Sequence, residues 1–185
     1  MNAFEDFLEA YAELERSIQE LMGQLFSETC GLCTACCCRV DICEEATQSA
    51  FLARLLKRQE LDAKDLDDRY GWLDQSGCTL EYGRPPICYA YFCDQLLARL
   101  PDDETRYVTR VLGRLLDYIG EKALNEWHLV EIMDSTDLMK VDFDALFMRL
   151  EEAQHAHLVI EQFVESGRLG SAARQVLDAI PIEDT

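Results

Sequence analysis

Apolar side chains near the start of the chain recur at alternating intervals of three and four residues. This heptad seam consists of Phe4, Phe7, Tyr11, Leu14, Ile18, Leu21 and Leu25, and it is widened by Leu8 and Met22. Such spacing places apolar groups on one side of an α-helix and predicts a helix that ends near Ser27. Three heptads are short for an independent coiled coil, so we expect the seam to pack on the domain core. The alternative is a homodimer, or a complex with another protein partner, formed through the helix of residues 4–25.

Helical spacing returns in five later segments. It predicts helices over about residues 44–58, 87–100, 103–124, 142–166 and 171–180. Gly167 suits the C-cap of the long helix over residues 142–166, and Ser76-Gly77 predicts a turn just before Cys78. The pattern over residues 125–133 is compatible with either a helix or a strand. The fold class is therefore mainly α, a small helical domain with a cysteine-rich metal-binding loop region inserted between helices.

The 185 residues are enough for one domain that buries a substantial core. Three regions follow from the pattern: an N-terminal amphipathic helix over 1–28, a cysteine-cluster metal-binding region over 29–100, and a helical C-terminal region over 101–185. With 49% hydrophobic and 29% charged residues, the composition is typical of a soluble globular protein. We expect the three regions to form one compact domain.

The charge of the chain narrows the range of partners. Lys and Arg number 17 against 36 Asp and Glu, which gives a formal net charge of −19. Nucleic acids and anionic membrane surfaces are bound largely through Lys and Arg, so neither is expected as a partner. No apolar run approaches the ~18 residues of a membrane span, and the acidic, periodic N-terminus does not resemble a secretory signal. We therefore expect a cytoplasmic protein.

Cysteine is the abnormal residue type in this chain. Of nine cysteines, six lie between positions 30 and 43 and three between 78 and 93, whereas the last 92 residues contain none. In the cytoplasm, clustered thiols bind metal or do redox chemistry more often than they form structural disulfides. The odd number also argues against a closed disulfide framework, so the clustering indicates a site.

The spacing of the first cysteines indicates the kind of site. Cys30, Cys33 and Cys36 are separated by two residues each, so a tightly folded loop can turn all three thiols toward one point. Such a tripod, completed by a distant fourth cysteine, holds an iron–sulfur cube. Zinc also takes four thiolates, usually from two separated CxxC pairs, and no second CxxC pair occurs here. This favours a [4Fe-4S] cluster, with zinc as the alternative.

The remaining cysteines supply candidates for the distant ligand. Cys88 is preferred because Pro85 and Pro86 fix the backbone that approaches it. The further candidates are Cys37, Cys78 and Cys93. For each of Cys38 and Cys43, the role of a small buried residue and the role of an extra ligand are equally favoured. Arg84 is either a cofactor-binding residue that offsets part of the charge of an anionic centre or an ordinary surface arginine.

These residues carry a resemblance to a known family. The string Cys30-x-x-Cys33-x-x-Cys36-Cys37, followed by Cys78-x5-Arg84-Pro85-x-x-Cys88, resembles the YkgJ-like CxxCxxCC family of zinc- or iron-chelating proteins. The resemblance covers residues 30–93. The family is also similar to the cysteine-rich region of flagellin lysine methylases, which implies an iron–sulfur cluster as occupant. Family members usually carry a further cysteine just before a Phe-Leu pair; here the stretch is Tyr70-Gly71-Trp72-Leu73, which implies a replaced ligand.

Three functions follow from this reading. The first is an iron–sulfur protein in electron transfer, redox sensing or partner recognition. The second is a structural zinc module that presents a helical surface to other proteins, in which metal binding is coupled to folding. The third is a group-transfer enzyme with an ancillary metal centre, supported only by the resemblance to the methylase region. No residue is assigned a catalytic role, and His128 beside Trp127 is expected to be partly buried.

Overall fold

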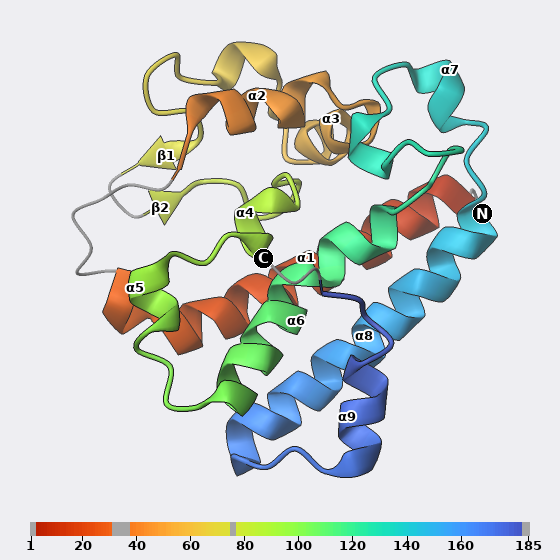
Figure 1. The fold of residues 1–185 in the computed structure, drawn as a ribbon. Helices are drawn as coiled ribbons and strands as arrows, with labels where there is room; N and C mark the ends of the chain where they lie inside the picture. Colours follow the sequence, from red (N-terminus) through yellow and green to blue (C-terminus); the bar gives the residue numbers. More distant parts are fainter. Residues whose placement is uncertain (1–2, 31–37, 75–76, 183–185) are drawn as a thin grey trace.

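Three long helices form the frame of the molecule (Figure 1). The computed structural model describes residues 3–30, 38–74 and 77–182, and for residues 27–30 it describes the backbone only. Helix α1 (Ala3–Cys30) and helix α6 (Asp103–Gly120) both pack against helix α8 (Phe143–Ser166), and α9 (Ser171–Leu177) folds back onto α8. The prediction of a mainly helical domain is confirmed. None of the helices in the described ranges is long and apolar enough to cross a membrane.

The heptad seam of α1 lies in the core of its own chain. Its side chains from Phe4 to Leu21 are buried, and Leu25, at 36%, is the one that reaches solvent. The predicted helix is confirmed and continues three residues past Ser27. The expectation that the seam packs on the domain core is therefore the one that these buried side chains bear out.

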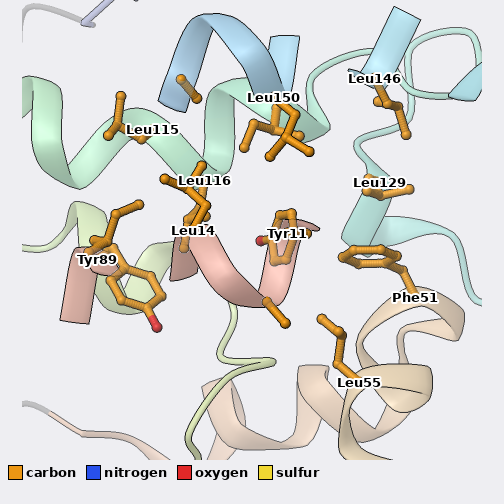
Figure 2. Close-up of a cluster of buried hydrophobic side chains, with 14 of the residues drawn as sticks. Tyr11, Leu14, Phe51, Leu55, Tyr89, Leu115, Leu116, Leu129, Leu146 and Leu150 are labelled. Atoms are coloured by element: carbon orange, nitrogen blue, oxygen red, sulfur yellow. The ribbon is translucent and has the colours of Figure 1, made fainter. Parts of the chain in front are cut away.

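Aromatic rings join α1 to its neighbours. The Phe7 ring lies edge-on to Phe147 of α8, with the ring centroids 5.4 Å apart, and the Tyr11 ring lies edge-on to Phe51 at 5.0 Å. Figure 2 shows how leucines from α6 and α8 close the same cluster around Tyr11. One hydrophobic core therefore holds residues from the start, middle and end of the chain.

The predicted helix over 44–58 is two helices, α2 (Val40–Gln48) and α3 (Ala50–Arg58). Ser49 separates them and caps α3, since its hydroxyl accepts a hydrogen bond from the Leu52 amide. The Ala50 amide donates to the carbonyl of Ile132, 2.8 Å away, instead of continuing the helical ladder. The apolar face of this segment is nevertheless as predicted, because Phe51, Leu52, Leu55 and Leu56 are all buried.

A short irregular stretch leads from α3 to a small hairpin. It contains the 3₁₀ turn η1 (Ala63–Asp65) and the antiparallel strands β1 (Leu73–Asp74) and β2 (Gly77–Cys78). Leu73 pairs with Cys78 and Asp74 pairs with Gly77. The predicted turn at Ser76-Gly77 falls partly outside the described residues, and Gly77 has φ +122°, which favours glycine.

The predicted helix over 87–100 is wrong as a single element. It consists of α4 (Ile87–Ala90) and α5 (Asp94–Leu97), with extended backbone at Tyr91 and Cys93. The Phe92 ring between them packs on Phe26 of α1, with centroids 5.7 Å apart, and against Gly113 of α6. The helix breaks because this ring is drawn into the frame.

The segments that follow α6 are shorter than their apolar pattern predicted. Helix α6 ends at Gly120 and not near residue 124, because the His128 ring packs directly on Gly120. Residues 125–133 are neither helix nor strand, apart from an isolated Leu124–Trp127 bridge and the 3₁₀ turn η2 (Leu129–Glu131). Helix α7 (Ser135–Leu138) leads to α8, which begins after the Asp142 cap and ends at Gly167, with φ +66°. Helix α9 ends at Leu177, three residues before the predicted end.

Candidate metal centre

The predicted site residues divide into two groups in the structure. Cys33, Cys36 and Cys37 lie outside the described residues, and Cys30 is the last residue of α1, where only the backbone is described. Cys78, Cys88, Cys93 and Arg84 are described, as are Cys38 and Cys43. The geometry therefore concerns the second half of the predicted site and the two cysteines that follow the tripod.

Arg84 joins the loops that carry Cys78 and Cys88. Its guanidinium donates to the Leu80 carbonyl from Nη2 at 2.8 Å and from Nε at 3.2 Å, and to the Cys78 carbonyl from Nη2 at 3.3 Å. Arg84 is half-buried, and its positive charge opposes the rise that burial causes in the pKa of Cys88. The side chain thus holds the strand β2 loop against the segment that leads to Cys88, and it places a cation beside the thiol.

Glu15 of α1 fixes the same segment from the other side. Its carboxylate is fully buried and accepts three hydrogen bonds: from the Gly83 amide at 2.7 Å, the Arg84 amide at 2.9 Å and the Tyr89 hydroxyl at 2.7 Å. Burial raises the pKa of Glu15, while these three hydrogen bonds and the Arg84 charge act in the opposite direction. A buried carboxylate therefore holds the backbone before the double proline and the Tyr89 side chain after it.

A second polar contact extends this attachment along α1. Gln19, one turn after Glu15, donates from Nε2 to the Tyr89 hydroxyl at 2.7 Å and to the Glu81 carbonyl at 2.9 Å. We name this set of Glu15, Gln19 and Tyr89 the α1 clamp. It ties the loop before Cys88 to the helix that ends at Cys30.

Sequence reasoning missed Glu15, although a signal was present. Glu15 lies seven residues after Leu8 and seven before Met22, the two residues that widen the apolar stripe of α1. A seven-residue interval returns to nearly the same side of a helix. A carboxylate at that position is expected to be buried or at a boundary, and a buried carboxylate requires hydrogen-bond donors.

Cys43 lies against the segment that precedes strand β1 rather than on an open helix surface. It belongs to α2 and is half-buried. Gly71 faces it so closely that an added Cβ would lie 2.6 Å from the Cys43 Sγ, and Gly71 has φ +62°. Two residues after Gly71, Leu73 pairs with Cys78. The structure therefore brings the end of the first cysteine group next to the start of the second.

Other cysteines act on the thiol of Cys88. Although part of the residue reaches solvent, burial raises the pKa of its thiol to about 12, and Cys78, Cys43 and Cys38 raise it further. Like charges raise one another's pKa only when they are close, so these four cysteines from three segments share one neighbourhood. A bound cation would reverse this effect, since it deprotonates the thiols that coordinate it.

Cys93 lies in a different part of this region. It is the N-cap of α5 and makes no side-chain capping hydrogen bond. The preceding residue, Phe92, packs on Phe26, which lies one turn before Cys30 in α1. Figure 1 shows α5 beside the C-terminal end of α1. Helix α5, which follows Cys93, therefore lies beside the end of α1.

The donor set fits a soft metal or an iron–sulfur cluster. The side chains gathered around Cys88 are thiols, which such centres prefer. Within the described ranges, no three Cys, His, Asp or Glu side chains are close enough together to hold a single metal ion. No protein-family model matches the chain, and neither a curated protein nor a solved structure matches it significantly.

The three histidines of the chain lie outside both cysteine groups in the sequence. His128 is largely buried, as predicted; its Nε2 contacts the Asp117 carbonyl at 2.8 Å and its Nδ1 accepts from the Val130 amide at 3.2 Å. Burial lowers the pKa of His128 to about 4. In α8, His157 is buried and His155 is exposed, as expected of residues two apart on a helix. His128 therefore caps η2 and is not aimed at the cysteines.

Proposed function

We propose that this chain binds an iron–sulfur cluster, [4Fe-4S], and acts in electron transfer, redox sensing or partner recognition. The proposed ligands are Cys30, Cys33, Cys36 and Cys88, with Cys37, Cys78 and Cys93 as further candidates. Arg84 is proposed to offset part of the negative charge of the centre. The resemblance to the CxxCxxCC family supports this proposal without adding an activity.

One observation supports the proposal above the others. Cys38, Cys43 and Cys78, which lie up to 50 positions from Cys88 in sequence, each act electrostatically on Cys88. Thiols that serve only as small buried residues have no reason to gather across three segments. Their convergence is what a centre made from both cysteine groups requires.

The shape of the loop before Cys88 supports Cys88 as the distant ligand. Pro85 and Pro86 are buried, the two amides before them are held by Glu15, and the Cys88 amide donates to the Pro85 carbonyl at 2.9 Å. Ligands that are held before the metal arrives lose little conformational freedom on binding. Arg84 and the α1 clamp are the residues that orient this part of the site.

When bound, a cluster of this kind supplies one-electron redox chemistry, and its potential depends on net charge, hydrogen bonds and solvent exposure. The residues of this chain determine those properties. The guanidinium of Arg84 places a positive charge next to Cys88, and the partial exposure of Cys88 leaves one side of the site open to solvent. A positive charge at this position favours the reduced form of a centre, because that form is the more negative one.

The test is the metal content of the full chain produced and purified without oxygen. We expect about four iron and four sulfide per chain, a broad absorption near 400 nm (roughly the range of sulfide-to-iron charge transfer) and an EPR signal after reduction. A colourless protein that holds one zinc and no iron would replace the cluster by a structural zinc module. Protein that binds neither metal after reconstitution would overturn both.

A further inference from the structure

A pocket of about 450 Å³ lies at the end of the frame where α6 begins and α8 ends (Figure 1). The end of α1 and helix α5 complete its walls. Small-molecule sites commonly have volumes of roughly 300–1,000 Å³, so this pocket is large enough for a small ligand. Its walls include buried apolar side chains from all four helices: Phe26, Leu96, Val108, Leu112, Ile160 and Phe163.

One polar side chain interrupts the apolar wall. Thr109 of α6 lines the pocket and is buried, with 3% of its surface exposed. A threonine within a helix can donate to a carbonyl one turn earlier, but the Thr109 hydroxyl makes no hydrogen bond to the part of the chain that the structure describes. Unlike the unpaired hydroxyl of Tyr11, its oxygen is not sealed from solvent. The Thr109 hydroxyl therefore faces the pocket with its donor and acceptor positions unused.

The charged groups of the pocket lie at its mouth. Arg99 and Asp102 are exposed, and Glu104 lies 3.9 Å from the Nη1 of Arg174. Asp102 caps α6, since its carboxylate accepts from the Thr105 amide at 2.7 Å. Two carboxylates beside one guanidinium do not attract an anion, and a charge among the apolar side chains further in would lose its hydration without gaining a partner. The lining therefore favours an uncharged ligand.

We propose that this pocket binds an uncharged, mainly apolar small molecule with one hydroxyl or carbonyl group, and that this group pairs with the Thr109 hydroxyl. A threonine hydroxyl can donate to a carbonyl, and it can donate to or accept from another hydroxyl. The other contacts are apolar, so affinity follows the apolar surface that the ligand buries. Among the described residues that line the pocket there is no cysteine, so the inference is independent of the proposed metal centre.

Calorimetric titration of the full chain with straight-chain alcohols tests the class of ligand. Each buried methylene strengthens binding about fourfold, so we expect 1-octanol to bind about 15-fold more tightly than 1-hexanol. Octanoate has the same chain length but carries a charge, and we expect it to bind at least about tenfold more weakly than 1-octanol. A pocket that holds only water would give no saturable binding of 1-octanol. That result, or equal binding of octanoate, would overturn the inference.

Substitutions on α8 test where the alcohol binds. Val164 lines the pocket and is 37% exposed, so Val164→Phe adds bulk to the pocket from its open side. Leu158 is 55% exposed on the same helix and does not line the pocket, which makes Leu158→Phe the matched control. We expect Val164→Phe to weaken binding of 1-octanol about tenfold and Leu158→Phe to leave it unchanged. Equal affinities would mean that the alcohol adsorbs elsewhere, which contradicts the inference.

Nuclear magnetic resonance of the unaltered chain gives the same information without any substitution. We expect 1-octanol to shift the methyl signals of Val108 and Ile160, which line the pocket, and to leave those of Leu52 and Leu55 in α3 unchanged. Shifts confined to α3, or spread evenly over the core, would show that the pocket is not the binding site.

The role of Thr109 is tested by two substitutions of similar size. Thr109→Val keeps the shape of the side chain and removes the hydroxyl, so we expect about fivefold weaker binding of 1-octanol. Its melting temperature should not fall, because the hydroxyl makes no hydrogen bond within the described chain. Thr109→Ser keeps the hydroxyl and should bind 1-octanol within about twofold of the unaltered chain. If Thr109→Val binds 1-octanol as tightly as Thr109→Ser, the hydroxyl does not recognise the ligand and the inference is overturned.

Discussion

The helical frame and the cysteine region of this protein differ in how far polar contacts add to apolar burial. We define the frame as α1, α6, α8 and α9, and the cysteine region as residues 38–43 and 70–93. The frame is joined by buried apolar side chains from each of its helices. The cysteine region contributes Trp72, Leu80 and Tyr89 to the same core, and it is also tied to α1 by the three hydrogen bonds to Glu15.

This difference explains how a small domain can hold a thiol site at its surface in a fixed geometry. Apolar burial is non-directional, so it tolerates many side-chain arrangements. Hydrogen bonds to a buried carboxylate are directional and cost much when broken, so they fix the backbone of the loop before Cys88 in one position. The frame supplies stability, and the α1 clamp supplies geometry to the cysteine region.

The largest effect is expected at Glu15. Glu15→Ala leaves the Gly83 and Arg84 amides and the Tyr89 hydroxyl without their acceptor in a buried place. We expect a loss of about 3–5 kcal/mol in the free energy of unfolding, measured by urea denaturation. The exposed neighbour Glu13 gives the control, and Glu13→Ala should change stability by less than about 0.5 kcal/mol. Equal effects at the two positions would show that the clamp does not hold the region.

The next effect is a dependence of stability on pH that originates at His128, whose ring packs on Gly120 of α6. Burial lowers the pKa of His128 to about 4 from 6.5, so the folded protein disfavours the charged ring. The contribution is fully present above pH 6.5 and is lost as the pH falls toward 4, because the unfolded chain then binds a proton that the folded chain does not. We expect about 3 kcal/mol over this range. In His128→Asn, whose side chain can still cap η2, this part of the pH dependence should vanish.

A smaller effect is expected at Gly113, where the frame meets the cysteine region. A Cβ at this position would lie 2.5 Å from Phe92 and 2.6 Å from the Tyr89 carbonyl, so Gly113→Ala forces α4 away from α6. We expect a loss of about 1–3 kcal/mol, read from thermal unfolding. Gly23→Ala is the counterpart, because Gly23 lies in α1 with nothing within 4 Å of the added Cβ. That variant should be more stable by about 0.5–1 kcal/mol.

The smallest effect is expected at the start of α8. Asp142 accepts hydrogen bonds from the Asp144 and Ala145 amides at 3.1 and 3.2 Å and caps the helix. Asp142→Ala should cost about 1 kcal/mol in chemical denaturation. Because this cap belongs to the frame, metal content should stay unchanged. A loss of metal in Asp142→Ala would mean that the two regions are coupled more strongly than their contacts indicate.

The frame could be predicted from the sequence because its side chains follow the period of a helix. The apolar seam of α1 and the faces of α6 and α8 identified these helices, and most of those side chains are buried. The breaks could not be predicted in the same way. Ser49 ends α2 because Ala50 donates to Ile132, and Phe92 interrupts a helix to reach Phe26 and Gly113. Each break depends on a residue distant in sequence.

The candidate site shows the same division. Spacing alone singled out Cys88 and its double proline, and Arg84 as a companion. It did not reveal that Glu15 accepts from the loop before Cys88, or that Cys43 faces Gly71, 28 positions further along the chain. A hydrogen bond or a contact between two loops leaves no periodic trace, so local patterns could not identify either partner.

Amide hydrogen exchange of the metal-loaded and metal-stripped full chain tests the central claim most directly. The claim is that a thiol-bound centre orders the cysteine region while apolar burial maintains the frame. We expect stripping to accelerate exchange in residues 38–43 and 77–93 and to leave α6 and the middle of α8 as protected as before. Equal acceleration in both regions, or no change in the cysteine region, would contradict it.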